Sequence, residues 1–156
     1  MKTKTIVITG ASGGLGDELA RQLGAQGHNL VLAARREIEL SNVVKQIGKN
    51  AIAVVADIKI RSNVDNIKTV ALQKFPTIDV WVNNAGRGIR KNVLELTDDD
   101  VDEIIAVNVK SAIYGMQAIV PFFMQRGEGH LINISSFLGR VPYVSFRSIY
   151  SAAKAA

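Results

Sequence analysis

The feature that most constrains the fold is a glycine-rich turn between a strand-like run and a helix-like run. The apolar, β-branched run Thr5–Thr9 leads directly into Gly10–Gly16, which contains four glycines. Leucines then recur every fourth residue, the period of an α-helix that buries one face, at Leu15, Leu19 and Leu23. A strand that passes through glycines into a helix is the local context of a phosphate-binding loop.

Glycines in such a turn let the backbone bend tightly and approach a ligand closely, and the following helix N-terminus offers free N–H groups and a positive dipole end. The sequence therefore predicts a dinucleotide-binding loop, and a glycine-rich turn without a ligand is the alternative. The candidate cofactor-binding residues in the loop are Gly10, Ser12, Gly14, Leu15 and Gly16.

Strand-like and helix-like segments alternate along the rest of the chain. The apolar runs are Thr5–Thr9, Asn29–Ala33, Ala51–Ala56, Val80–Val82 and Leu131–Ile134, and each is continuous, as in a strand buried on both faces. After the first helix, closed by Gly24 and Gly27, helices are expected at Glu37–Ile47, at Ser62–Phe75, from Thr97 to Arg126 with a disturbance at Pro121, and from about Phe146 onward. This order predicts an α/β fold, a doubly wound parallel sheet of Rossmann type with strand order 3-2-1-4-5.

Composition narrows the class of protein. The 156 residues are 47% hydrophobic and 21% charged, which is typical of one folded domain, here a dinucleotide-binding domain over residues 1–156. Cysteine is absent, and His28 and His130 are interpreted as structural, so no metal site is expected. The net charge is +5, but the basic residues are scattered along the chain, which argues against nucleic acid as a partner. No run is long enough for a signal peptide or a membrane span, and we expect a cytoplasmic protein.

The end of the second strand indicates the choice of cofactor. In dinucleotide-binding domains an acidic residue about 20 positions beyond the glycines holds the ribose 2′-hydroxyl, whereas an arginine suits a 2′-phosphate. That position is Ala34, followed by Arg35 and Arg36. Because a guanidinium grips a phosphate with two parallel hydrogen bonds, the sequence favours NADP(H) over NAD. The alternative is a pair of surface arginines at the start of the second helix.

Tyr150 and Lys154 stand four residues apart, on one face of the last expected helix. A free tyrosine titrates near pH 10, too high for proton transfer at neutrality. A cation about 4 Å away, at an effective dielectric of about 20, stabilises a phenolate by roughly 4 kcal/mol. The pair is therefore a candidate for acid–base catalysis.

With these residues in place, the sequence resembles the short-chain dehydrogenase/reductase family over essentially its whole length. The motifs that carry the resemblance occur in the family's order: the loop Thr9–Gly16, Asp57, Asn83–Gly86, Asn108, Ser136 and the Tyr150/Lys154 pair. A single Tyr-x-x-x-Lys is common by chance, whereas six such elements in order are specific.

The resemblance implies a role for each motif. Tyr150 would protonate the carbonyl oxygen as hydride arrives, and Lys154 would bind the nicotinamide ribose. Ser136, with Gly139 at the family spacing, would hydrogen-bond the substrate oxygen, and Asn108 would position a water next to Lys154. Asp57, with Ile58 beside it, would meet the adenine, and the cofactor would be lined by Asn84, Ala85 and Gly86.

Structural roles are the alternative for several of these residues. Ser136 would then cap a strand end, Asn108 would be a buried polar strut, and Asp57 would cap the next turn. Ser136 and Tyr150 are also 14 positions apart, one more than the family pattern leads us to expect.

The sequence stops at Ala156, two residues after Lys154, whereas family members continue with further strands. We therefore expect a domain incomplete at its C-terminus, with Tyr150 and Lys154 on a fraying turn, weak cofactor binding and little catalysis at this length.

The expected function is hydride transfer between NADP(H) and a carbonyl or alcohol substrate. A non-catalytic dinucleotide sensor and an epimerase or dehydratase on the same framework are the alternatives. The residues near the site predict an apolar small-molecule substrate, and they are Gly88, Leu138, Val141, Tyr143 and Phe146. We expect a homodimer or homotetramer that pairs through the long helix Thr97–Arg126.

Overall fold

The computed structural model describes residues 2–141 and 145–156, so Tyr143 lies outside the described residues. The strands are β1 (Thr5–Thr9), β2 (Asn29–Ala34), β3 (Ala51–Val55), β4 (Val80–Asn83) and β5 (His130–Asn133). The α-helices are α1 (Gly14–Ala25), α2 (Glu37–Ile47), α3 (Arg61–Lys74), α4 (Asp98–Ile105), α5 (Ser111–Arg126) and α6 (Ser148–Ala155). Between them lie a π-helical turn, Ala106–Lys110, and three short 3₁₀ turns, Val93–Glu95, Phe137–Gly139 and Ser145–Arg147.

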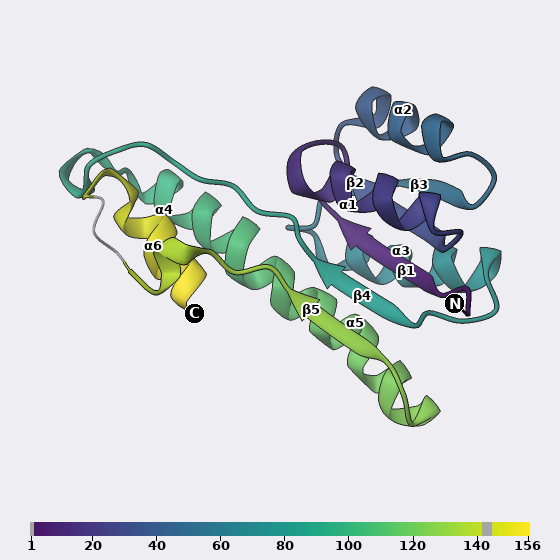
Figure 1. Ribbon diagram of the computed structural model, residues 1–156. Coiled ribbons are helices and arrows are strands. Elements are labelled where there is room, and N and C mark those ends of the chain that lie inside the picture. Colours follow the sequence, from purple (N-terminus) through teal and green to yellow (C-terminus); the bar gives the residue numbers. More distant parts are fainter. Residues whose placement is uncertain (1, 142–144) are drawn as a thin grey trace.

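All strand pairs are parallel, and the five strands follow the order β3-β2-β1-β4-β5, which confirms the predicted topology. Helices α1 and α2 cover one face of the sheet, and α3 and α5 cover the other (Figure 1). The α4 to α5 helical run extends past the carboxyl ends of the strands, where α4 and the 3₁₀ turn Phe137–Gly139 pack against α6 (Figure 1). Loops that follow the strands therefore meet next to α6.

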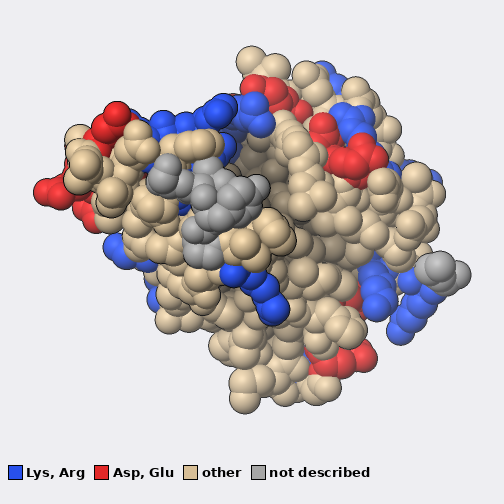
Figure 2. All heavy atoms as spheres, turned by 60° about the vertical axis from the view of Figure 1, so that its left-hand side comes forward, with Lys and Arg blue, Asp and Glu red and all other residues tan. Residues whose placement is uncertain are grey.

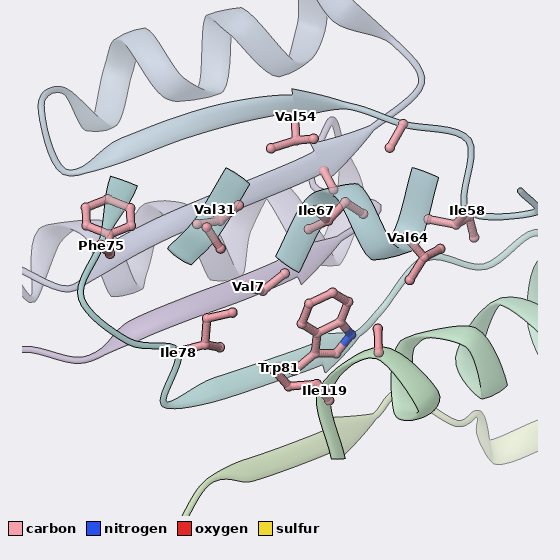
Figure 3. Packing of buried hydrophobic residues seen from close by; sticks show 14 of the residues in the cluster. Val7, Val31, Val54, Ile58, Val64, Ile67, Phe75, Ile78, Trp81 and Ile119 are labelled. Carbon is pink, nitrogen blue, oxygen red and sulfur yellow. The ribbon is translucent and has the colours of Figure 1, made fainter. Parts of the chain in front are cut away.

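The core follows from strand alternation. Val7 and Ile8 are both fully buried because successive side chains of β1 point to opposite covered faces. On the α3/α5 face, Trp81 packs with Val7, Ile67 and other apolar side chains (Figure 3). The central strands thus have the predicted burial on both faces.

The outer strands depart from that prediction. Val55 of β3 is 52% exposed, and Ile132 of β5 is 44% exposed. Both strands lie at the edges of the sheet, where helices cover less of the surface. The prediction that these two strands are buried on both faces is therefore wrong for these side chains.

The long helix expected from Thr97 is continuous, but its irregularity lies elsewhere than predicted. Thr97 caps α4, and its Oγ1 accepts a hydrogen bond from the Asp100 backbone at 3.2 Å. The Lys91 side chain, with the Thr97 backbone, lowers the pKa of Asp100 to about 2. The helix passes through Pro121, which is exposed, without a break. The departure from α geometry is the π-helical turn Ala106–Lys110.

By length and composition alone the run Asp98–Arg126 would be long and apolar enough to cross a membrane. Part of this run packs on the sheet, with Ile119 and Phe123 in the core, and core helices of soluble proteins pass the same test.

A buried amide links β4 to β5 and to α5. Asn83 Oδ1 accepts from Trp81 Nε1 at 2.8 Å, and Asn83 Nδ2 donates to Asn133 Oδ1 of β5 at 2.8 Å. The same Nδ2 donates to the Ala112 carbonyl of α5 at 3.2 Å. Gly115 is required opposite, because a Cβ there would collide with Asn83 Oδ1. Asn83 thus braces the sheet through contacts that include a helix glycine, which sequence reasoning did not identify.

Candidate active site

A cavity of about 290 Å³ lies at the carboxyl ends of the strands. Eight of the predicted cofactor-binding residues line it: Gly10, Ser12, Arg35, Arg36, Asp57, Ile58, Ala85 and Gly86. Its other lining residues are Gly13, Ala34, Ala56, Arg87 and Val107, which sequence reasoning did not select. Ligands of doubly wound sheets bind at this edge, because the loops that follow the strands converge there.

The glycine loop is held tightly against the loop after β4. Gly10 has a φ of +71°, and a Cβ on it would lie 2.7 Å from the Cα of Ala85. Gly14 has a φ of +59° with open space beside it, and Gly16 packs against the Gly10 carbonyl. Within the described residues no side chain caps the start of α1, so its first N–H groups have no side-chain partner there. Leu15, in this first turn, is 59% exposed.

Asn84 connects this loop to the sheet and does not line the cavity. Its Nδ2 donates to the Thr9 carbonyl at 2.9 Å, and its backbone N–H donates to Thr9 Oγ1 at 3.1 Å. Asn84 thus holds the start of the glycine loop through Thr9.

The two arginines after β2 take different positions. Arg36 donates from Nε to Ser12 Oγ at 3.2 Å and from Nη2 to the Ser12 carbonyl at 3.0 Å, and so lies across the glycine loop. Arg35 Nη1 lies 4.0 Å from Asp57 Oδ2. Asp57 Oδ1 also accepts from the Lys59 backbone N–H at 3.0 Å, as the turn-capping alternative predicts. Of the two guanidiniums after β2, the one nearer the glycine loop is therefore Arg36.

At the other end of the cavity, Gly86 brings two predicted catalytic residues together. A Cβ on Gly86 would lie 3.0 Å from Asn108 Oδ1 and 3.2 Å from Lys154 Nζ. Asn108 sits in the π-helical turn, where its Nδ2 donates to the Arg87 carbonyl at 2.8 Å and its Oδ1 accepts from the Arg87 backbone N–H at 3.2 Å. Asn108 therefore has the structural role of a buried polar strut, as the alternative interpretation predicted. It holds the loop that borders the cofactor cavity.

The loop between β5 and α6 packs against the last turn of α6. Ser135 Oγ donates to the Lys154 carbonyl at 2.8 Å, and a Cβ on Gly139 would collide with the same carbonyl. Ser136 Oγ accepts from the Leu138 backbone N–H at 3.2 Å and so caps a 3₁₀ turn. Tyr150, half-buried on α6, has the guanidinium of Arg147 over its ring at 5.9 Å. Sequence reasoning did not identify this arginine beside the tyrosine.

The family profile described as short chain dehydrogenase matches residues 4–156. The chain belongs to the short-chain dehydrogenase family. An uncharacterized oxidoreductase of Staphylococcus epidermidis is 34% identical over 156 residues, covering 100% of this chain and 67% of its relative. The chain thus spans about two-thirds of the length of the curated relatives it matches.

Two solved structures with bound cofactors show the same fold. A 3-ketoacyl-(acyl-carrier-protein) reductase from Brucella melitensis complexed with NADH is 31% identical, with a TM-score of 0.94 over 97% of this chain and 64% of that one. A metagenomic short-chain oxidoreductase in complex with NADP is 34% identical, with a TM-score of 0.90 over 97% of this chain and 70% of that one. The family thus includes members bound to either nicotinamide cofactor.

In this member of the family, Lys154 is a half-buried cation. Its Nζ donates to the Ile134 carbonyl at 2.8 Å, and burial lowers its pKa below the usual 10.5. An amine with a depressed pKa loses its proton more readily when folded than when unfolded.

This linkage makes the contribution of Lys154 to stability depend on pH. Above its folded pKa the folded state holds fewer protons than the unfolded state, so the free energy of unfolding rises with pH up to about 10.5. We expect the stability of the wild type relative to Lys154→Met to increase over that interval, as measured by urea unfolding at a series of pH values. A difference that stays constant from neutral pH to about 10.5 would contradict the assignment.

Proposed function

We propose that the protein is an NADP(H)-dependent oxidoreductase that interconverts a carbonyl compound and an alcohol. The observation that carries the proposal is that Asn108 and Lys154 both approach Gly86, which lines the glycine-rich cavity. Lys154 lies on the same helix as Tyr150. Proton-transfer groups and a dinucleotide site thus share one edge of the sheet, as oxidoreductase chemistry requires.

The residues present fit a dinucleotide phosphate. Positive-φ glycines and the uncapped start of α1 suit a pyrophosphate, since they allow close backbone approach and offer free N–H donors. Arg35 and Arg36 line the same cavity, and Ala34 stands where a carboxylate would repel a 2′-phosphate. This charge arrangement supports NADP(H) over NAD for this chain.

When bound, the nicotinamide supplies or accepts the hydride. The protein's own groups manage the proton and hold the substrate. Tyr150 acts as general acid toward the substrate oxygen, and the hydroxyl of Ser136 donates a hydrogen bond to that oxygen. Lys154 holds the nicotinamide ribose, and Asn108 positions a water beside Lys154.

The proposal is tested with the full-length protein, NADPH and a panel of ketones and aldehydes, by following absorbance at the nicotinamide band. Oxidation of NADPH that depends on an added carbonyl compound is the expected result. Tight NADPH binding with no turnover of any carbonyl would instead identify a dinucleotide sensor. Conversion of a sugar nucleotide without net NADPH consumption would identify an epimerase or dehydratase.

Removing Arg35 should change the cofactor preference. We expect Arg35→Ser to raise KM for NADPH by about 10- to 100-fold, because hydrogen bonds to charged groups contribute about 1.5–3 kcal/mol, and to leave KM for NADH within about twofold. Lys49→Ser, an exposed position away from the cavity, makes the same change of net charge and serves as the control. Equal losses with the two cofactors would contradict the role of Arg35 and favour Arg36 as the phosphate ligand.

We infer a cytoplasmic homodimer or homotetramer that folds as one dinucleotide-binding domain and acts on a small molecule, with neither nucleic acid nor a membrane as partner. Exposed apolar residues on the outer side of α5, including Ile113 and Met124, support pairing through this helix.

A further inference from the structure

Two loops contact each other reciprocally in front of α6. The guanidinium of Arg90, in the loop after β4, lies over the ring of Phe146 at 5.4 Å. In the opposite direction, Arg147 Nη1 donates to the Ile89 carbonyl at 3.4 Å. Each loop thus supplies one arginine and one contact surface for the arginine of the other. The two arginines therefore lie on loops that contact each other.

Arg147 lies beside the proposed proton donor, and both arginines lie outside the cofactor cavity. Arg147 sits over the ring of Tyr150 at 5.9 Å, whereas neither Arg147 nor Arg90 lines the cavity of the glycine loop. Gly88 makes room for Arg147 beside the tyrosine, because a Cβ there would collide with Arg147 Nη1 and lie 3.9 Å from Tyr150 Cδ2. A group bound by Arg147 would therefore be close to the ring of Tyr150.

The charges of the two arginines are not neutralised within the part of the chain that the structure describes. Their neighbours in the β4 loop are paired, Arg87 with Glu103 at 3.3 Å and Lys91 with Asp100 at 2.6 Å. In residues 2–141 and 145–156 no carboxylate oxygen lies within 4.0 Å of either Arg90 or Arg147. Figure 2 shows Lys and Arg side chains gathered along the edge of the hollow between the α4–α6 part and the sheet. A guanidinium has five N–H donors, and Arg147 has one hydrogen bond to a described residue.

We propose that Arg90 and Arg147 bind an anionic group, carboxylate or phosphate, on the carbonyl substrate. The inference rests on the proposed function and replaces the expected apolar substrate with a charged one. Paired guanidiniums recognise such groups because their planar N–H donors match two oxygens at once. The anion would anchor the substrate next to Tyr150 and so fix the distance between the anionic group and the reacting carbonyl.

Matched charged and neutral carbonyl compounds test this assignment. Acetoacetate is compared with acetoacetamide, and dihydroxyacetone phosphate with dihydroxyacetone, using NADPH and the full-length protein. We expect kcat/KM for the charged member of one pair to exceed that for its neutral partner by at least about tenfold. The pair that shows the preference distinguishes carboxylate from phosphate. The same kcat/KM for charged and neutral members of both pairs would overturn the proposal.

Variants separate anion binding from loop support. Arg147→Gln and Arg90→Gln should each remove most of the preference for the charged compound and leave kcat/KM for the neutral one within about twofold. Arg140→Gln, an exposed cation in the β5–α6 loop, is the control and should leave the preference intact. If charged and neutral compounds lose activity equally in both variants, the arginines only hold the loops together, and the proposal fails. Arg90 has no hydrogen bond to a described backbone group, so its variant remains informative if Arg147→Gln is unstable.

A direct binding measurement keeps this inference separate from the proposed function. Ligand-observed NMR with acetoacetate and with dihydroxyacetone phosphate requires no turnover. Line broadening by the wild type that is lost in Arg90→Gln supports anion binding even if no carbonyl is reduced. No broadening of either anion would overturn it even if neutral ketones are reduced.

Discussion

Tyr150→Phe should lower kcat for NADPH-dependent carbonyl reduction by about 10²- to 10⁴-fold, the usual contribution of a general acid. The substitution removes only the hydroxyl, and the half-buried ring keeps its place on α6 beside Arg147. NADPH affinity, measured by fluorescence titration, should stay within about twofold, since Lys154 and the glycine loop are unchanged. The loss should therefore fall on the chemical step.

Tyr114→Phe is the matched control for this substitution. Tyr114 is also partly buried and has an arginine, Arg61, over its ring at 5.9 Å, but it lies on α5 against α3 and lines neither end of the cofactor cavity. It should keep the full rate. If Tyr150→Phe also kept the full rate, the proton would come from another group, and the proposed mechanism would be wrong.

Gly10→Ala should lower the free energy of unfolding by about 3 kcal/mol and weaken NADPH binding at least about tenfold. Two costs add: a side chain at a φ of +71° costs about 1–2 kcal/mol, and a Cβ placed 2.7 Å from the Cα of Ala85 costs about 1–3 kcal/mol. The backbone cannot move away easily, because the Gly10 N–H donates to the Ala33 carbonyl at 2.8 Å. Urea unfolding and NADPH titration measure the two effects.

Gly27→Ala separates the two costs. Gly27 has a similar φ of +80°, but apart from its chain neighbours no described atom lies within 4 Å of a Cβ at this position, and it does not line the cavity. It should lose only the conformational part, about 1–2 kcal/mol, and keep its NADPH affinity. If both variants lost the same stability and bound NADPH equally well, the close packing of Gly10 on Ala85 would not support the site.

Sequence reasoning was most successful where the information is local. The strand order follows from the alternation of apolar runs and helices, because parallel connections cross over in one hand. The capped start of α4 at Thr97 and the single helix that carries Tyr150 and Lys154 also depend only on neighbours along the chain. The same local reasoning placed the irregularity of the long helix at Pro121, whereas the structure has it at the π-helical turn Ala106–Lys110.

Other features of the site depend on contacts between residues far apart in the sequence. The sequence did not reveal that Arg36 hydrogen-bonds to Ser12 across the glycine loop. It also did not reveal that Asn108, in a π-helical turn, hydrogen-bonds to the backbone of Arg87. A prediction that assumes 3.6 residues per turn misses a π-helical turn, because that turn contains one residue more than an α-helical turn.

The sequence by itself determined the sheet order, the glycine loop and the spacing of the candidate acid and its lysine, because short-range periodicity and backbone preferences specify them. Only the tertiary structure decided which groups surround that acid. Arg147 approaches Ile89 across 58 positions, and this contact depends on how two loops pack at the end of the sheet. No local pattern encodes the packing of such distant segments, since their contact is stabilised only once the strands are aligned and the loops meet.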